Sequence, residues 1–334
     1  MRSRILIAGF TALLLAPPAA APVFAEDIAT YTMIVRAPPG GGYDTNARIL
    51  ARHMPRHLPG NPTFIVQNMP GGGGRKAAQY IDNVAPKDGS VILATDQGTV
   101  LAQAFGEQDL RYDVLKWNWI GVIDSPPYAV VINANSPVKT IADARAREVI
   151  VSASGATSIS AVHPKVVNMI AGTRFKVILG YQVSAQAHLA MERGEVDGIG
   201  TYNWAAVRRD GYLGKIMPLV VISDHLTPDM PPGTPKLADL ATNDEDKALA
   251  AFIVNAQNMA KPFTMASGLP PERVAAVRAA FAATMKDPLF LAEAEKLKID
   301  VAPIDDQRLM AIVRDVIDAP SAVRERAASL MQEK

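Results

Sequence analysis

The sequence predicts an α/β protein with two lobes, on three observations. Apolar, β-branched segments alternate with helix-like segments through most of the chain, a pattern typical of parallel sheets that helices cover on both faces. The chain has 334 residues, a length at which division into two domains is usual. No flexible linker separates two halves, so we expect the chain to cross twice between the lobes, with a ligand cleft between them.

The N-terminal residues have the layout of an export signal. Arg2 and Arg4 supply the positive start, and Ile5 to Ala16 form an apolar stretch too short for a stable membrane span. The tripeptide that ends at Ala25 has the small-x-small pattern of a cleavage site, which predicts a signal peptide over residues 1–25. No later stretch is apolar for long enough to cross a membrane, so we expect a mature protein that is exported and soluble.

Composition excludes several classes of function. Removal of the signal leaves 32 basic and 33 acidic residues, a formal charge of −1, which gives no overall attraction for nucleic acid or an anionic membrane. The chain contains no cysteine, so disulfides, thiolate metal sites and a cysteine nucleophile are excluded. We expect neither a bound metal nor a cofactor.

The predicted strands follow from the apolar segments. They are expected at residues 30–37, 63–68, 90–96, 118–123, 128–133, 148–153, 175–180, 196–201, 217–223 and 251–257. The segments 119–133 and 249–262 are the predicted crossings between lobes. They divide the mature chain into a domain of residues 26–126 with 251–334 and a domain of residues 127–250.

Helices are predicted between these strands. A helix from Asp44 to Leu58 has apolar residues on one face, and a second, Ser184 to Arg193, has Ser184 placed to cap its start. Residues 270–331 have a helical pattern almost throughout, and prolines interrupt it at Pro288, Pro303 and Pro320.

Two glycine runs stand between a predicted strand and a predicted helix. Gly40–Gly42 precedes the first helix, and Gly71–Gly74 follows the second strand. Glycines at a helix start let backbone N–H groups approach an anion, although a single such run is more often an ordinary turn. Neither run fits a nucleotide motif: both lack the third glycine of a dinucleotide loop, and Ala77 follows Lys76 where a P-loop needs Ser or Thr.

A third helix entrance has small hydroxyl residues instead. The stretch from Ser154 to Ser158 leads from a strand into a helix, and helix capping alone is an equally good interpretation. Pro164 suits the first turn of a helix, which favours a start at His163. Together the three entrances predict a site that holds an anion with a carboxylate at either end, without an arginine.

Catalytic and metal-binding interpretations have less support. The chain has no G-x-S-x-G and no H-E-x-x-H motif. His53 and His57 have the i, i+4 spacing of metal ligands, but the arginines beside them favour a solvated basic face. Asp44 is interpreted as a helix N-cap in preference to a catalytic acid.

The quoted motifs resemble a known family. "PPGGGYDTNARILARHM", "VQNMPGGGGRKAAQYI" followed by "APKDGSVILAT", and "LAMERGEVDG" are similar to the extracytoplasmic solute receptors of tripartite tricarboxylate transporters, the Bug family. The resemblance covers the mature chain from Tyr31 to about Val316, in the expected order.

The resemblance implies a two-lobed periplasmic binding protein fold (type II-like, a Venus flytrap) that closes on an organic anion, usually a carboxylate. The family's ligand-binding positions, carried over by motif, are Gly40, Gly41, Gly42, Tyr43, Asp44, Pro70, Gly71, Gly72, Gly73, Gly74, Ser154, Gly155, Ala156, Thr157, Ser158, Tyr181, Ser184, Asp197 and Tyr202. The chain departs from the family pattern at "ISAVHPKVV", "MAKPFTMASGLPPE" and Tyr181–Val183, where the far end of the ligand is expected.

These observations predict a monomeric periplasmic receptor that delivers a carboxylate to the membrane permease of a tripartite tricarboxylate transporter, without chemistry of its own. An exported hydrolase or lyase that uses Asp44 or Asp197 as a base is the alternative. A receptor that signals to a sensor kinase has the same sequence features.

Overall fold

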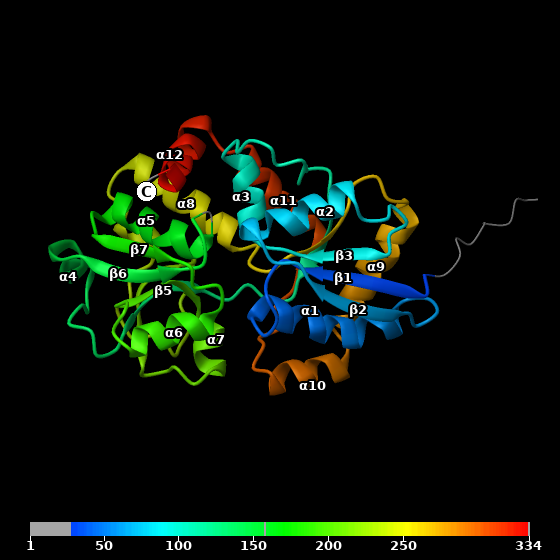
Figure 1. The fold of residues 1–334 in the computed structure, drawn as a ribbon, viewed down its shortest axis with the longest axis horizontal. Coiled ribbons are helices and arrows are strands. Elements are labelled where there is room, and N and C mark those ends of the chain that lie inside the picture. Colours follow the sequence, from blue (N-terminus) through cyan, green and yellow to red (C-terminus); the bar gives the residue numbers. More distant parts are fainter. Residues whose placement is uncertain (1–27, 157, 333–334) are drawn as a thin grey trace, which may run out of the picture.

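The computed structural model describes residues 28–156 and 158–332, which form two lobes, each built on one sheet (Figure 1). The predicted signal peptide, residues 1–25, lies outside the described residues. Within the described part of the chain, no helix is both long and apolar enough to span a bilayer. The two lobes confirm the predicted fold class.

The first sheet carries the N-terminal strands. Its strand order is β11 (Ile304–Asp305), β4 (Asn118–Val122), β10 (Phe263–Met265), β3 (Val91–Ala94), β1 (Thr30–Val35) and β2 (Thr63–Asn68). β1 pairs in parallel with β2 and β3, whereas β10 is antiparallel to both β3 and β4. In Figure 1, α2 (Arg75–Asn83) and α3 (Gln97–Ala104) lie above these strands, and α1 (Gly42–His53) lies below.

The second sheet has the order β7 (Phe175–Leu179), β6 (Val149–Ala153), β8 (Gly198–Asn203), β5 (Tyr128–Asn133) and β9 (Ile216–Ile222). β6 is parallel to β7 and β8, and β5 is antiparallel to β8 and β9. In Figure 1, α5 (Ile159–Ala171) covers one face, and α6 (Ser184–Glu192) and α7 (Trp204–Arg209) cover the other.

The sheets are mixed, whereas the sequence pattern predicts parallel ones. β5 and β10 are reversed, and so is the short β11, which is antiparallel to β4. β5 and β10 follow the two crossings, and a chain that leaves one lobe at its cleft edge enters the next lobe at that lobe's cleft edge. β5 and β10 therefore start where their parallel neighbours end. The division of the chain into domains stays a prediction from the sequence. It assigns residues 26–126 and 251–334 to one domain and residues 127–250 to the other.

The remaining helices complete the two lobes. They are α4 (Ile141–Ala146), α8 (Asp244–Gln257), α9 (Pro271–Thr284), α10 (Pro288–Lys296), α11 (Asp306–Ile317) and α12 (Ser321–Gln332), with the 3₁₀ turns η1 (Met54–His57), η2 (Gly72–Gly74) and η3 (Leu237–Leu240). Pro288 is the first residue of α10, Pro303 precedes β11 and Pro320 precedes α12. The C-terminal helices thus break at the three predicted prolines.

The predicted strand at residues 251–257 is wrong. These residues belong to α8, which Asn243 caps by accepting a hydrogen bond from the amide of Asp246 at 2.8 Å. Leu249 and Ile253 are buried one helical turn apart. A short apolar run fits a buried helix and a buried strand equally well. Here the N-cap Asn243 and the acidic first turn after it begin a helix that continues through residues 251–257.

The helix after the third entrance begins earlier than predicted. α5 starts at Ile159, with Ser158 as its N-cap, so Pro164 lies inside it and His163 does not begin it. Proline removes the hydrogen bond that the carbonyl of Ser160 would accept. Gly200 of β8 lies against this carbonyl, since a Cβ on Gly200 would come within 2.0 Å of it. α5 therefore accommodates Pro164 at a place where it lies close to β8, opposite a glycine without a side chain.

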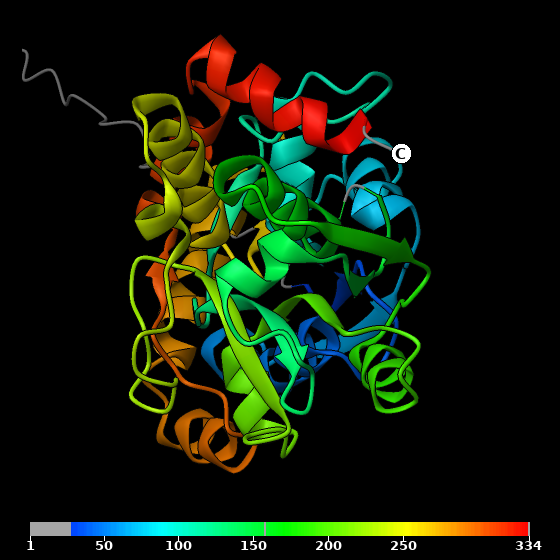
Figure 2. The ribbon, with the colours of Figure 1, turned by 90° about the vertical axis from the view of Figure 1, so that its left-hand side faces the viewer.

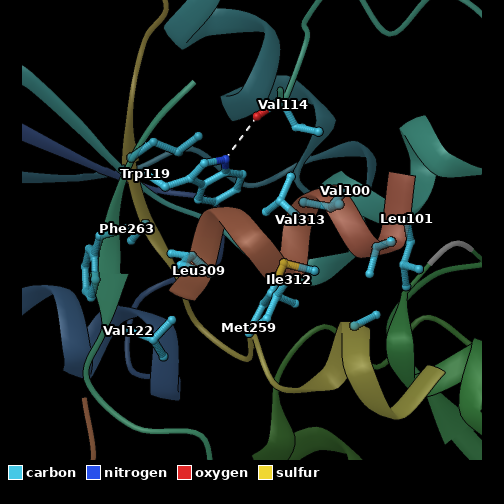
Figure 3. Close-up of a cluster of buried hydrophobic side chains, with 14 of the residues drawn as sticks. Val100, Leu101, Val114, Trp119, Val122, Met259, Phe263, Leu309, Ile312 and Val313 are labelled. Carbon is cyan, nitrogen blue, oxygen red and sulfur yellow. Dashed lines mark hydrogen bonds between the residues drawn. The ribbon is translucent and has the colours of Figure 1, made fainter. Parts of the chain in front are cut away.

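The core of the first lobe forms where α3 and α11 pack over β4 and β10 (Figure 3). Trp119 is fully buried there and donates its indole N–H to the carbonyl of Val114 at 3.0 Å. Leu309, Ile312 and Val313 of α11 belong to the same buried cluster and lie on one side of it in Figure 3. This packing fixes β4 and β10, the strands that border the two crossings.

The C-terminal helix joins the lobes from outside. α12 runs across the top of the second lobe in Figures 1 and 2 and packs against α5 and α8. The Nζ of Lys165 donates to the carbonyl of Leu330 at 2.7 Å. The chain end that follows the first lobe thus also supports the second.

Candidate functional site

A cleft of about 470 Å³ lies between the two lobes, a volume within the usual range for small-molecule sites. Residues from both sheets line it. The first lobe contributes the ends of β1, β2 and β3, and the second contributes the ends of β6, β7 and β8. Strand ends and helix starts from both sides therefore meet at one place, as in α/β proteins whose ligands bind beyond the carboxyl ends of the strands.

The first glycine run forms the start of α1. Gly41 is its N-cap and Gly42 its first residue, so Asp44 lies in the first turn and is not the N-cap that the sequence predicts. Asp44 instead accepts hydrogen bonds from the Gly40 amide at 2.9 Å, from Arg48 Nε at 2.8 Å and from Asn68 Nδ2 at 2.9 Å. Although burial opposes it, these bonds hold the pKa of Asp44 below its usual value. Asp44 therefore fixes the loop and is turned away from the cleft.

The second glycine run is shaped by backbone that only glycine adopts easily. All four residues of Gly71–Gly74 have positive φ, between +56° and +138°. The amide of Gly74 donates to the carbonyl of Gly71 at 3.0 Å. The first N–H groups of a helix have no acceptor within it. α1 begins at Gly42 and α2 follows its N-cap Gly74, and both glycines line the cleft. Both glycine runs thus present polarised backbone donors to the same space.

The second lobe presents a serine cluster at the start of α5. Ser158 Oγ donates to the Gly155 carbonyl at 2.6 Å and lies 2.8 Å from Ser160 Oγ. The amide of Ser154 donates to Ser160 Oγ at 3.1 Å. Gln182 Nε2 donates to the carbonyl of Ser154 at 2.7 Å, which ties this entrance to the loop before α6.

That loop and β8 complete the second wall. Ser184 is the first residue of α6, whose N-cap is Val183, so Ser184 is not the cap that the sequence predicts. Tyr202 of β8 donates its hydroxyl to Asp210 Oδ2 at 3.0 Å. Burial, together with the Asp210 carboxylate, raises the pKa of Tyr202. Tyr202 therefore faces the cleft as a neutral phenol.

The structure brings most of the predicted site residues together around the cleft. Those that line it are Gly41, Gly42, Tyr43, Pro70, Gly71, Gly72, Gly73, Gly74, Ser154, Gly155, Ala156, Ser158, Tyr181, Ser184 and Tyr202. Thr157 lies outside the described residues. Their role in binding a ligand stays a prediction.

Three predicted site residues do not line the cleft. Gly40 and Asp44 hold each other behind the first glycine run. Asp197 lies before β8, at the edge of the sheet away from the cleft, and its Oδ2 accepts from the Ile150 amide at 2.7 Å. Asp197 thus ties β8 to β6 and does not face a ligand.

The cleft also contains charged side chains that the sequence did not single out. Arg36, Asp96, Arg209 and Lys261 line it. The signal for Arg36 and Asp96 is their place at the C-terminal ends of the predicted strands 30–37 and 90–96, the ends that carry the site. Lys261 had no such signal, because β10, which follows it, was not predicted.

Four charges alternate along the cleft edge of the first sheet. In strand order they are Asp124 after β4, Lys261 before β10, Asp96 after β3 and Arg36 after β1. Lys261 Nζ lies 3.0 Å from Asp124 Oδ1, and Arg36 Nη1 lies 2.5 Å from Asp96 Oδ2. Both pairs are nearly enclosed, so each charge has its partner beside it.

The histidines with metal-ligand spacing are engaged elsewhere. His53 Nε2 lies 2.5 Å from Glu293 Oε2, and His57 Nε2 lies 2.8 Å from Asp287 Oδ2, both beside α10. The predicted solvated basic face is therefore a paired interface instead. Within the described residues, no three His, Cys, Asp or Glu side chains are placed to hold a metal ion.

The fold and the cleft define a two-lobed solute-binding protein. The chain matches the family profile described as tripartite tricarboxylate transporter family receptor over residues 46–327. It belongs to this receptor family, as its motifs indicate.

Individual relatives agree with this assignment. The chain is 30% identical to a UPF0065 protein of Bordetella bronchiseptica over 177 residues, which is 50% of this chain and 52% of that protein, so it spans about half the length of this relative. It resembles the structure of the periplasmic binding protein BugD, with a TM-score of 0.69 and 19% identity over 91% of this chain and 96% of that chain.

It also resembles R. palustris Rpa4515 with adipate, with a TM-score of 0.70 and 21% identity over 90% of this chain and 97% of that chain. At these identities the structural matches show the fold.

Proposed function

We propose that this protein is an exported periplasmic receptor that captures a small organic carboxylate in the cleft and delivers it to the membrane permease of a tripartite tricarboxylate transporter. The observation that carries the proposal is the convergence of helix starts on one cleft, α1 and α2 from the first lobe and α5 and α6 from the second. Helix N-termini favour negative charge, and opposed pairs of them suit an anion with a charged group at each end.

The charge of the lining supports an anionic ligand. Arg36, Arg209 and Lys261 line the cleft with Asp96, whereas the carboxylates that pair with Lys261 and Arg209, Asp124 and Asp210, lie outside the lining. Adipate, bound by a relative of the same fold, is a linear dicarboxylate. Family membership supports delivery to a permease, and the same cleft would serve a receptor that reports to a sensor kinase.

We propose binding without chemistry. Asp44 and Asp197, the two carboxylates considered as catalytic bases, have structural roles. Asp44 holds the first glycine run, and Asp197 holds β6. A general base must come within hydrogen-bond reach of the proton that it removes. Neither side chain borders the cleft.

Gly41→Val tests whether the first glycine run contacts the ligand. Gly41 has φ −87° and ψ 174°, which valine adopts without strain, and a Cβ there would have no heavy atom within 4 Å. Because Gly41 lines the cleft, a valine there would occupy space beside the ligand position. We expect at least a tenfold weaker affinity for the organic anion that most raises the melting temperature of the purified mature protein, or about 1.4 kcal/mol.

Thr140→Val is the matched control. Thr140 caps α4 outside the cleft, so the variant also receives a valine N-cap, and it should bind as wild type does. Gly72→Val and Arg75→Ala complete the set. Gly72 lines the cleft at φ +56°, whereas Arg75 is paired with Glu107 and lies outside the lining. If Gly41→Val and Gly72→Val both bound the anion normally, contact between the glycine backbone and the ligand would be refuted. If neutral sugars alone raised the melting temperature of the wild type, an anionic ligand would be refuted.

A further inference from the structure

Arg36 is a cation placed between the two glycine runs. It follows β1 directly and lines the cleft, with 14% of its side chain exposed. Its guanidinium carbon lies 5.2 Å from the centre of the Tyr43 ring, which belongs to the first turn of α1. Arg36 therefore contacts the element that the first glycine run begins.

The second glycine run is shaped around the same side chain. A Cβ on Gly74 would lie 2.7 Å from Arg36 Nε, closer than two such atoms approach, and Gly74 also has φ +102°. A residue with a side chain at position 74 would thus displace the guanidinium. The last glycine of this run makes room for Arg36 as well as shaping the loop.

Arg36 has one counter-charge, Asp96, a hydrogen bond with the Tyr43 hydroxyl and one unsatisfied donor, Nε. Asp96 faces Nη1 at 2.5 Å and is 2% exposed, and Thr99 Oγ1 donates to its Oδ1 at 3.4 Å. Arg36 Nε, in contrast, is buried with no acceptor among the described residues. Buried donors are normally paired, and an unpaired one costs about 1–3 kcal/mol. An acceptor is therefore missing beside the glycine runs.

We propose that Arg36 binds the ligand's carboxylate directly at the glycine-run end of the cleft, and that Asp96 positions Arg36 and offsets part of its charge. The proposal rests on the proposed function and refines it, because the sequence alone predicts an anion held by backbone without an arginine. A fixed guanidinium provides a charge-assisted hydrogen bond to a carboxylate, so it selects a charged group over a neutral one of the same shape.

Opposite effects of the two members of the pair distinguish this role from a structural one. Arg36→Gln removes the charge, and we expect at least tenfold weaker binding of the organic anion that most stabilises the wild type in a melting screen of oxalate to adipate, citrate and benzoate. Asp96→Asn removes the counter-charge and leaves Arg36, so the same anion should bind several-fold more tightly. A pair that only supports the fold would weaken binding in both variants.

Arg36→Gln leaves Asp96 buried without its counter-charge, which destabilises the protein. The double variant Arg36→Gln/Asp96→Asn removes both charges and so avoids this effect. It should be as stable as wild type to within a few degrees in melting temperature and still bind the anion at least tenfold more weakly. The neutral amide of the anion, with every carboxylate converted, gives the second readout: its affinity should be the same in the wild type and the double variant. Arg75→Gln, the same change outside the lining, should alter neither ligand's affinity.

Each outcome decides the proposal. If no anion in the screen stabilises the wild type, the proposed function fails and the role of Arg36 falls with it. If the wild type binds an anion and the double variant binds it equally well, the proposed function stands and the role of Arg36 is refuted. Weaker binding by Asp96→Asn would likewise refute the assignment of Asp96.

Discussion

At the residue scale, His163 shows how a buried titratable group supports the cleft wall. It lies in α5, is 2% exposed, and its Nδ1 lies 2.7 Å from Thr201 Oγ1. Thr201 lines the cleft, so this contact fixes a lining side chain from behind. Burial lowers the pKa of His163 from 6.5 to about 3, and the ring is therefore neutral at physiological pH.

This pKa predicts a specific loss of stability in acid. The folded protein keeps His163 neutral down to about pH 3, whereas the unfolded chain takes up the proton near pH 6.5. Stability is thus fully present above pH 6.5 and is lost as the pH falls, by up to about 1.4 kcal/mol per pH unit. His163→Asn should show a shallower fall in the free energy of unfolding between about pH 6.5 and pH 4, measured with urea.

The comparison isolates one histidine. His188 has a pKa lowered to about 4 by burial and contributes a similar slope, but both proteins contain it. Equal slopes in the two proteins would show that His163 is protonated in the folded state.

At the element scale, α10 is attached to the first lobe by charge pairs. Asp287 precedes α10, caps it by accepting from the Leu289 amide at 2.8 Å, and also faces Arg56 and His57. The hydrogen bond from Arg56, with a further one from His57, holds the pKa of Asp287 well below its usual range. The charged form of Asp287 therefore joins α10 to η1.

Asp287→Asn tests this attachment, because asparagine retains the cap and removes the charge. A lowered pKa in the folded state gives stability that is present above the unfolded value near 3.8 and is lost as the pH falls below it. We expect the variant to lose about 2 kcal/mol of unfolding free energy at pH 7. The difference between the proteins should shrink below about pH 4, and a difference that does not change with pH would contradict this origin.

At the scale of the whole molecule, the two crossings are joined to each other. Lys261 of the second crossing pairs with Asp124 of the first through both carboxylate oxygens, at 3.0 and 3.2 Å. Asp124 also accepts from Asn46 Nδ2 of α1 at 3.1 Å, and Ser125 Oγ donates to the carbonyl of Asn258 at 2.9 Å. These contacts join the two crossings to each other beside the cleft, which Lys261 lines.

The buried pair predicts a non-additive pattern of stability. Asp124→Leu leaves Lys261 buried without its counter-charge, which typically costs about 3–5 kcal/mol. The double variant Asp124→Leu/Lys261→Met removes both charges and should recover most of this loss. Urea unfolding of the ligand-free proteins measures both. If the single and double variants were equally destabilised, packing and not charge would hold the crossings.

The elements that the sequence predicts are those with a local cause. Nine of the expected strands and the breaks at Pro288, Pro303 and Pro320 are present, because apolar runs and prolines restrict the backbone wherever they stand. The segment 251–257 failed because a short apolar run has no period that separates helix from strand. β10, with three residues, was too short to leave a pattern.

The sequence by itself determined the fold class, the family and the glycine-rich helix starts, since these depend on local patterns and on motifs that are contiguous in the chain. Only the tertiary structure decided what faces the cleft. It turned Asp44 and Asp197 into contacts within their own lobes, and it brought Arg36 and Lys261 to one edge from positions 225 residues apart. Arg36 pairs there with Asp96, and Lys261 pairs with Asp124. Which charges meet at this edge depends on strand order and direction, and these are set by how the whole chain packs.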